Sequence, residues 1–537
     1  MDGWNHLQVI GGTISSYIHS FVSTDSFNQE AKRKESEFDQ LGVEFSKLGT
    51  RLNRWVGSIA AVLPQVTALT GTAHEHAFFL NELAEQSRYL MSQPEEELAA
   101  ELSLNGSVAW SKLQGTVTSQ LTWEIELDGE IQRLPMSAIT NLRSHPDEAV
   151  RRRGYEVELK AWEQVKEPLA ASLNGVKGTA NTLNRRRGRQ DCIHSALDHN
   201  RIDRATLDAM LTAMRESLPM FERYFKAKAA RLDKEKLAWW DLFAPTGKAD
   251  RTYSFDEARE MILKNFAEFS PELAAFAQNA FEKNWIDTEM RPGKRGGAFC
   301  MGVPGVKESR VLCNFDGSLD SVSTMAHELG HAFHNYCASQ AHRTELQQIT
   351  PLTMAETASI MCETILVEAA LKQSTSPEET LYILETALIG DSQVVVDIYS
   401  RFLFEKEIFE RREKSELSAE DFSEIMTTMQ KAAYGNGLDE RYLQPYMWTW
   451  KPHYYIAELS FYNFPYTFGL LFGTGLYAIY QQRGADFIKD YKDLLACTGM
   501  DQAADLAARF GIDIRSVDFW RGSLAIIGKR VERYLAL

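Results

Sequence analysis

The sequence predicts a mainly α-helical fold with a small β-sheet. Helical periodicity with explicit start signals dominates the 537 residues, whereas only two stretches have the features of strands. Residues 121–127 (L-T-W-E-I-E-L) alternate between apolar and polar side chains and end in Asp128-Gly129, which is typical of a hairpin turn. Residues 296–315 form the second stretch, which is apolar and framed by glycines.

Start signals define several of the expected helices. Ser254-Phe255-Asp256-Glu257 is a capping box, and Ser270 and Ser376 each precede a proline that suits the first helical position. Five apolar residues behind Ser270 share one helical face, which we expect to be buried. They are Leu273, Phe276, Ala277, Ala280 and Phe281.

Composition and charge restrict the class of protein. The chain is 44% apolar, 25% charged and 11% aromatic, as in soluble globular proteins, and its net charge of −16 disfavours binding to nucleic acid. Six cysteines without a C-x-x-C pair argue against a disulfide scaffold or a thiolate zinc site. No apolar run approaches the roughly 18 residues that cross a bilayer, and the amino terminus lacks the basic start of a secretion signal. We therefore expect a cytoplasmic protein without a membrane partner.

The segment 321–334 (S-V-S-T-M-A-H-E-L-G-H-A-F-H) contains the motif H-E-x-x-H. On a helix His327 and His331 lie about 40° apart and one turn from each other, so both imidazoles can bind one ion. Glu328 projects about 60° beyond His331, where it can act as a general base on water held by the ion. The alternative is a helix with two surface histidines. The motif favours zinc, because an opposite apolar face would hold the helix rigidly in a core. That face comprises Val322, Met325, Leu329, Phe333 and Tyr336.

A catalytic zinc ion requires a third protein ligand. Two common continuations of the motif need a ligand at position 337 or near 351, where this chain has cysteine and proline. The next helix offers Glu356, but Thr353-x-x-Glu356 is also a capping box, so the residues alone support ligand and cap equally. Glu363 and Glu368 are further candidates, either supporting a ligand or facing solvent.

His334 lies on the same helical face as His327, about 10 Å further along the axis, and cannot share the ion. Three roles remain open for His334: a contact with substrate, a hydrogen bond that orients Glu356, and a packed core histidine.

These residues resemble peptidase family M3, the thimet oligopeptidase and oligoendopeptidase F group of zinc metallopeptidases. In that family a glutamate 25 residues after the second histidine completes the zinc site, and Glu356 occupies this position. Residues 239–242 (W-W-D-L) and 291–300 (R-P-G-K-R-G-G-A-F-C) are similar to segments of oligoendopeptidase F. The resemblance implies one Zn²⁺ ion bound by His327, His331 and Glu356.

The resemblance also implies a fold and an activity. The fold is a zincin-type helical metallopeptidase, with two helical lobes around a deep substrate channel and the small sheet near the active site. The activity is hydrolysis of internal bonds of short peptides by zinc-bound water, with Glu328 as the base. Two alternatives are the release of C-terminal dipeptides and an inactive peptide-binding protein, although a binding protein has no need of Glu328. Apart from the resemblance, the end of the basic run Arg185-Arg186-Arg187-Gly188 predicts a boundary near residue 190, which would separate a helical region with a hairpin (1–190) from the catalytic domain (191–537).

The glycine-rich segment suits the binding of peptides. Gly296, Gly297 and Ala298 would leave a strand edge open, to which an extended peptide can add through backbone hydrogen bonds. A tight turn between two strands is the alternative, and the glycines fit both.

A late segment, residues 453–469, resembles the part of the family that stabilises the tetrahedral intermediate. Tyr466, followed by T-F-G, is similar to the tyrosine that donates to the oxyanion, and Tyr462 to its neighbour. His453 resembles the histidine that precedes them, and Tyr455 is a further candidate, either as the donor to the oxyanion in place of Tyr466 or as a contact with the substrate.

Overall fold

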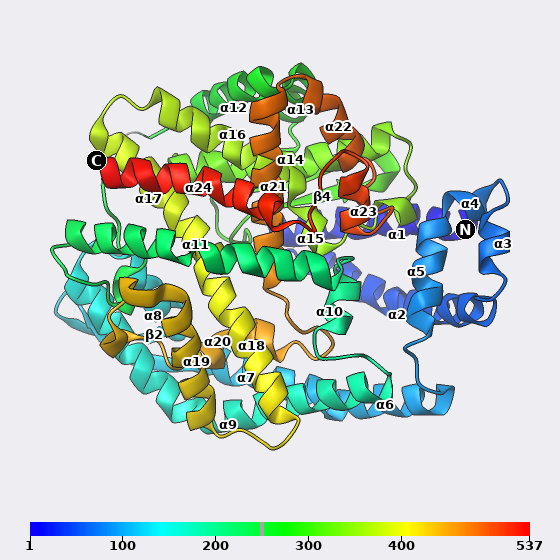
Figure 1. The fold of residues 1–537 in the computed structure, drawn as a ribbon, viewed down its shortest axis with the longest axis horizontal. Coiled ribbons are helices and arrows are strands. Elements are labelled where there is room, and N and C mark those ends of the chain that lie inside the picture. The colour runs from blue at the N-terminus through cyan, green and yellow to red at the C-terminus, as the bar shows by residue number, and fades with distance from the viewer. Residues whose placement is uncertain (248–251) are drawn as a thin grey trace. The chain divides into compact units, whose positions relative to one another are not determined.

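The computed structural model describes residues 1–247 and 252–537, and helices make up most of it (Figure 1). The chain folds into two compact units, each assembled from three segments of the sequence. Unit 1 consists of Met1–Leu90, Ala249–Ser374 and Gly469–Ile514; unit 2 consists of Met91–Lys248, Thr375–Phe468 and Arg515–Leu537.

Neither unit begins or ends near residue 190. This residue lies inside unit 2, between α9 (Glu148–Arg186) and α10 (His194–His199). The compact units therefore do not follow a division into residues 1–190 and 191–537, because segments distant in the sequence pack together in each unit.

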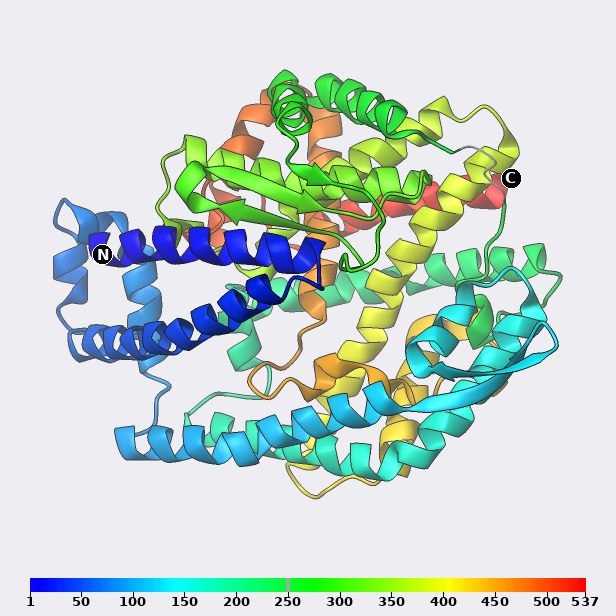
Figure 2. The same cartoon turned by 180° about the vertical axis from the view of Figure 1, so that it is seen from behind.

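Unit 1 combines helices with a three-stranded sheet. Its central strand β5 (Glu308–Leu312) pairs antiparallel with β4 (Phe299–Val303) and parallel with β3 (Ile286–Asp287), which leaves β4 at an edge. Two helices, α1 and α14, contact β4 (Figure 2). The helices of unit 1 are α1 (Asp2–Thr24), α2 (Gln29–Ser58), α3 (Leu63–Thr67), α4 (Thr72–Glu75), α5 (Ala77–Ser87), α12 (Phe255–Phe269), α13 (Pro271–Glu282), α14 (Leu319–Gln340), α15 (Leu352–Ala355), α16 (Thr357–Gln373), α22 (Asp486–Leu495) and α23 (Ala503–Ala508).

Unit 2 contains the predicted hairpin, formed by β1 (Thr122–Leu127) and β2 (Glu130–Pro135). Asp128 and Gly129 both have positive φ angles, as a two-residue hairpin turn requires. Helix α21 (Phe464–Arg483) begins in unit 2 and continues in unit 1 from Gly469. Besides α9 and α10, the helices of unit 2 are α6 (Gln93–Asn105), α7 (Ser107–Gln120), α8 (Met136–Asn141), α11 (Arg204–Arg231), α17 (Pro377–Ser392), α18 (Ile398–Arg412), α19 (Ala419–Tyr434), α20 (Met447–Trp450) and α24 (Val517–Ala536).

The predicted helix starts are confirmed. Ser254 and Glu257 form the capping box of α12, and Ser270 and Ser376 cap α13 and α17 in front of their prolines. The expected apolar face of α13 is buried throughout. The mainly α fold with small sheets is thus confirmed, whereas the channel between two lobes stays a prediction. None of the helices in the described ranges is long and apolar enough to cross a membrane.

Candidate metal centre

Helix α14 fixes the two histidines of the H-E-x-x-H motif. Its first turn is capped by Ser318, whose Oγ accepts a hydrogen bond from the Ser321 amide at 3.1 Å. The apolar face predicted from the sequence is buried from Val322 to Phe333, which anchors the helix in the core of unit 1. His327 and His331 lie one turn apart, and their ring centroids are 4.9 Å from each other.

Glu356 stands immediately before helix α16, which lies against α14. The two helices approach closely at Gly330, inside the motif, where a Cβ atom would lie 2.6 Å from the Ala358 carbonyl oxygen and from Ser359 Cα. Because only glycine fits this contact, Gly330 brings the start of α16 within reach of the histidines.

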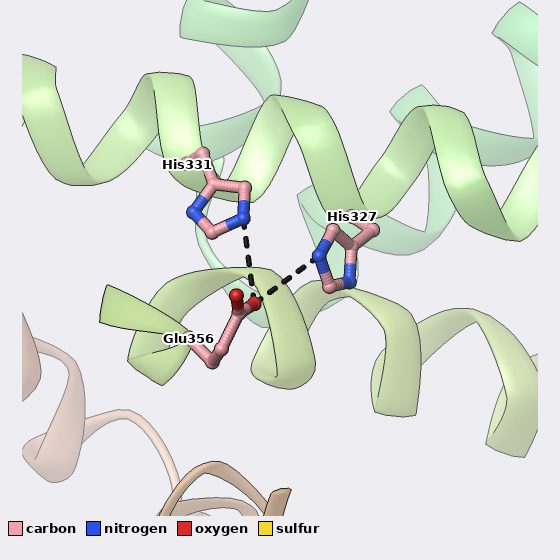
Figure 3. Close-up of side chains that lie close together, drawn as sticks. All are labelled: His327, His331 and Glu356. Atoms are coloured by element: carbon pink, nitrogen blue, oxygen red, sulfur yellow. Dashed lines mark ion pairs between the residues drawn. The ribbon is translucent and has the colours of Figure 1, made fainter. Parts of the chain in front are cut away.

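The three expected ligands converge on one point (Figure 3). Oε2 of Glu356 lies 3.2 Å from His327 Nε2 and 3.4 Å from His331 Nε2. Across residues 1–247 and 252–537, this is the one group of three or more His, Cys, Asp or Glu residues whose ligand atoms all lie within 4.8 Å of one another. Two imidazole nitrogens and one carboxylate oxygen form the donor set of a catalytic zinc site.

The capping alternative for Glu356 is not what the structure shows. Helix α15 begins at Leu352 with Pro351 at its N-cap, so Thr353 already lies inside the helix. The carboxylate of Glu356 points to the two histidines and accepts a hydrogen bond from Ser359 Oγ at 2.6 Å.

The charges of this cluster suit a cation. Burial alone would lower the pKa of His327. The hydrogen bonds to Glu356 and Glu363 outweigh this effect and raise the pKa to about 10. Burial in turn raises the pKa of Glu356, but the hydrogen bonds from both histidines hold it well below its usual range. Glu356 is therefore ionised, and its charge favours positive charge at this point, either the proton on His327 or a cation that replaces it.

Glu363 supports His327 from the side away from Glu356. Its Oε2 lies 3.2 Å from His327 Nδ1, so Nε2 of the same ring is left facing Glu356. A carboxylate on the second nitrogen of a ligand histidine fixes the tautomer and the ring orientation. Neither Glu363 nor Glu368 belongs to the three-residue cluster.

Glu328 is buried beside the histidines, with 6% of its surface exposed. Its Oε2 has no hydrogen-bond partner among the residues that the structure describes. Burial raises the pKa of this carboxyl, opposed by the charges of His327 and His331. A buried carboxylate oxygen without a partner is costly, and it fits a site built to hold a further polar group. The residues present thus fit a metal ion together with water.

A cavity of about 490 Å³ reaches the cluster within unit 1. His327, Glu328, His331 and Glu356 line it, as do Ala298 and the buried His334. His334 Nε2 lies 2.8 Å from Thr498 Oγ1, and burial lowers the pKa of His334 to about 4. His334 is therefore neutral, and its contact with substrate stays a prediction.

The glycine-rich segment leads into edge strand β4. Gly297 has a φ of +82°, which requires glycine, and its carbonyl accepts a hydrogen bond from Asn314 Nδ2 at 2.9 Å. Ser16 Oγ of α1 donates to the carbonyl of Gly302 at 2.8 Å, so that carbonyl points away from β5. Because strand residues alternate, the backbone of Cys300, two residues before Gly302 in β4, points to the same edge, away from β5. This edge is where the sequence predicts peptide binding.

His453, Tyr462 and Tyr466 form a second cluster, in unit 2. The His453 and Tyr462 rings are 4.9 Å apart, and the hydroxyls of Tyr462 and Tyr466 are 3.3 Å apart. Tyr466 is exposed, with 42% of its surface accessible, so its hydroxyl can reach a ligand. The roles of these residues stay predictions.

A buried network that the sequence did not reveal holds His453. Nδ1 of His453 lies 2.6 Å from Asn463 Oδ1, which also accepts a hydrogen bond from Arg401 Nη1 at 3.2 Å. Arg401 is paired with Asp397, which accepts a hydrogen bond from the Tyr434 hydroxyl. Since arginine can only donate, Asn463 presents its oxygen, and His453 Nδ1 must carry a proton.

Tyr455 is not a substrate contact. It is 1% exposed and packs in the core of unit 2 against α9, where its hydroxyl points to the Leu169 carbonyl. Full burial also raises its pKa well above the ordinary value. The prediction is corrected by packing, because Tyr455 and its neighbour Tyr454 both fill the core of unit 2, as large aromatic side chains commonly do.

Comparison with known proteins places the chain among peptidases. The sequence profile described as "Peptidase family M3" matches residues 141–526, and the profile described as "Oligopeptidase F" matches residues 70–123. The first of these matches spans more than half of the chain, including the whole metal cluster.

Individual relatives are distant in sequence, but their matches cover most of this chain. Oligopeptidase PepF of Bacillus subtilis is 24% identical over 448 residues, which cover 82% of this chain and 66% of the relative. An oligoendopeptidase F homolog of Lactococcus lactis is 23% identical over 534 residues, covering 96% of this chain and 86% of the relative. The crystal structure of a Chlamydophila abortus protein assigned as a peptidase superposes with a TM-score of 0.89 at 20% identity, covering 100% of this chain and 90% of that one. This likeness shows that the fold is shared.

Proposed function

Because the chain belongs to peptidase family M3, we propose that it is a zinc-dependent oligopeptidase that cleaves internal bonds of short peptides. The observation that carries this proposal is the convergence of His327, His331 and Glu356 next to the buried Glu328, with a cavity reaching all four. The names of the relatives from B. subtilis and L. lactis support oligopeptides as the substrate class. The cytoplasmic location stays a prediction.

His327, His331 and Glu356 would hold the metal. Zn²⁺ bound there would act as a Lewis acid, polarising the scissile carbonyl and lowering the pKa of a water molecule. Glu363 keeps the His327 ring in the orientation that presents Nε2. The protein thus supplies three ligands and leaves space for water and substrate in the cavity.

Glu328 is the proposed general base and acid. Its unpartnered Oε2 accepts the proton of the attacking water as the water oxygen bonds to the scissile carbonyl carbon. Glu328 then returns this proton to the amide nitrogen, which leaves as an amine. Burial, which raises its pKa, also makes the protonated form easier to reach during the reaction.

Tyr466 is the proposed donor to the oxyanion, with Tyr462 and His453 beside it. The family resemblance and the exposure of Tyr466 support this role. A hydroxyl donor to developing negative charge is typically worth about 3 kcal/mol.

Peptide backbone would pair with the free edge of β4. The backbone groups of Cys300 point to this edge, and Ala298 precedes the strand, whereas α1 occupies the edge at Gly302. Backbone pairing recognises an extended peptide without requiring particular side chains, as an oligopeptidase needs. Gly296, where a Cβ atom would meet no neighbour within 4 Å, leaves this approach open.

The test combines metal analysis with a quenched fluorescent peptide blocked at both ends. The purified protein should contain one zinc ion per chain and cleave this peptide internally, whereas dipeptide release would require a free carboxyl terminus. Glu328→Gln should keep the zinc and lose about 10³-fold in kcat. Glu345→Gln, which alters another half-buried carboxylate of unit 1, is the matched control and should leave kcat unchanged. An active Glu328→Gln enzyme would refute the base assignment.

A further inference from the structure

The side-chain stem of Glu356 is packed against helix α21. A Cβ atom on Gly469 would lie 2.6 Å from Glu356 Cβ and 3.0 Å from its Cγ, closer than such atoms come in proteins. Any other residue at 469 would therefore push the stem of Glu356 away from its position. Gly469 and Glu356 both belong to unit 1.

The carboxylate of Glu356 is held separately, by Ser359. The Ser359 hydroxyl donates to Oε2 at 2.6 Å, the same oxygen that faces Nε2 of both histidines. Ser359 has no exposed surface, so water does not compete for its hydroxyl, which also lies 3.1 Å from the backbone carbonyl oxygen of Glu356. The last torsion of a glutamate side chain is soft, and a buried donor on one oxygen restricts it.

We infer that Ser359 and Gly469 are positioning residues for Glu356, the first orienting its carboxylate and the second fixing its stem. The inference deepens the proposed metal site and rests on it. Neither residue is a ligand: the glycine has no side chain, and the serine acts through Glu356. Ligand carboxylates that are themselves hydrogen-bonded bind metal more tightly, and losing such a partner typically costs roughly 10- to 100-fold in affinity.

Matched residues separate this role from helix packing in general. Gly473 stands one turn after Gly469 on α21, and a Cβ atom there would lie 2.8 Å from the Ile360 side chain instead of from Glu356. Thr357 is equally buried on α16, but its hydroxyl donates to the Met354 carbonyl at 2.6 Å. Gly473→Ala and Thr357→Val should therefore disturb the same helices without removing either of the two contacts that hold the Glu356 side chain.

The experiment measures the Kd for Zn²⁺ of the full chain by competition with a chromophoric chelator. Ser359→Ala and Gly469→Ala should weaken binding by roughly 10-fold or more, whereas Gly473→Ala and Thr357→Val should stay within about threefold of the original protein. The visible spectrum of the Co²⁺-substituted protein should change in the first pair only. Thermal unfolding of all four variants shows how far each one disturbs packing.

The outcomes separate a failure of the positioning roles from a failure of the proposed function. If Ser359→Ala and Gly469→Ala bind Zn²⁺ as tightly as the original chain, or if both controls weaken it equally, the positioning roles are overturned. Should Gly469→Ala fail to fold, Ser359→Ala against Thr357→Val still decides the role of the hydroxyl. If the original chain binds no stoichiometric zinc, or if His331→Ala binds it normally, the proposed function itself fails.

Discussion

The two clusters of candidate catalytic side chains differ in charge and in how they are held. In unit 1, His327 and His331 face the carboxylate of Glu356, so the cluster concentrates ionisable groups around one point. In unit 2, His453 and Tyr466 belong to a cluster of an imidazole and two phenols, without a carboxylate. The first arrangement attracts a cation, and the second offers hydrogen bonds. A peptidase needs both, because metal chemistry generates the nucleophile while neutral donors stabilise charge that develops on the substrate.

Glu356→Ala gives the largest expected effect and tests the cluster in unit 1 that is proposed to bind a cation. Removing the carboxylate leaves two imidazoles, which cannot complete a zinc site, so stoichiometric zinc and activity should both disappear. The loss of affinity should exceed the roughly 10- to 100-fold typical of a supporting hydrogen-bond partner. Metal content after dialysis measures it. Normal zinc in this variant would show that Glu356 is not a ligand and that the third ligand lies elsewhere.

Tyr466→Phe tests the neutral cluster. The variant should retain one zinc ion per chain and lose about 10² in kcat, because a donor to the oxyanion is missing. Tyr462→Phe, which removes the hydroxyl 3.3 Å away, is the matched control and should have a smaller effect. If kcat is unchanged in Tyr466→Phe and falls in Tyr462→Phe, the two tyrosines exchange roles.

The centre in unit 1 could be predicted from the sequence because local spacing specifies most of it. The i, i+4 repeat of α14 places His327 and His331 on one face whatever the rest of the chain does. Glu356 was harder: its pattern with Thr353 also fits a capping box, and only the family spacing favoured a ligand. In the structure, the close contact of Gly330 with α16 brings the Glu356 carboxylate to the histidines, a long-range feature that spacing in the sequence does not reveal.

The residues around His453 could not be predicted in the same way. Arg401 contacts Asn463, and Asn463 contacts His453, only because α18 and the segment before α21 fold together, and no periodic pattern marks such contacts. Tyr455 was misassigned because its burial also depends on long-range packing. The sequence around a tyrosine near a functional histidine does not show whether the side chain faces a ligand or the core. The strands and capped helices were predictable because short-range chemistry determines them, whereas the interleaving of three segments in each unit was not.

Glu363→Gln tests how far the metal centre depends on support from outside the ligand set. The carboxylate contacts His327 Nδ1 at 3.2 Å, but its side chain is 42% exposed, so water can replace part of the interaction. Zinc affinity should fall by about 10-fold, the lower end for such partners. Glu368→Gln, on the same helix, is the control. Equal affinities in both variants would show that His327 is oriented by packing alone.

The smallest expected effect is on the pKa of His453 and sharpens the neutral side of the comparison. Burial, followed by the charges of Arg401 and Lys451, holds this pKa below the ordinary value of 6.5, partly offset by the hydrogen bond to Asn463. Because the folded chain then binds this proton less readily than the unfolded chain, the contribution to stability is fully present above pH 6.5 and is lost as pH falls below it.

Asn463→Asp places a carboxylate where an amide oxygen lies 2.6 Å from His453 Nδ1. Negative charge favours the imidazolium ion, so the pKa of His453 should rise, although Arg401 would share the new carboxylate and limit the change. The imidazole Cε1–H resonance, identified by its loss in His453→Gln, reports this pKa directly by NMR titration. Asn335→Asp, in unit 1, is the control and should leave it unchanged. An unchanged or lower pKa in Asn463→Asp would show that His453 Nδ1 does not face Asn463. Another residue would then have to orient the His453 ring.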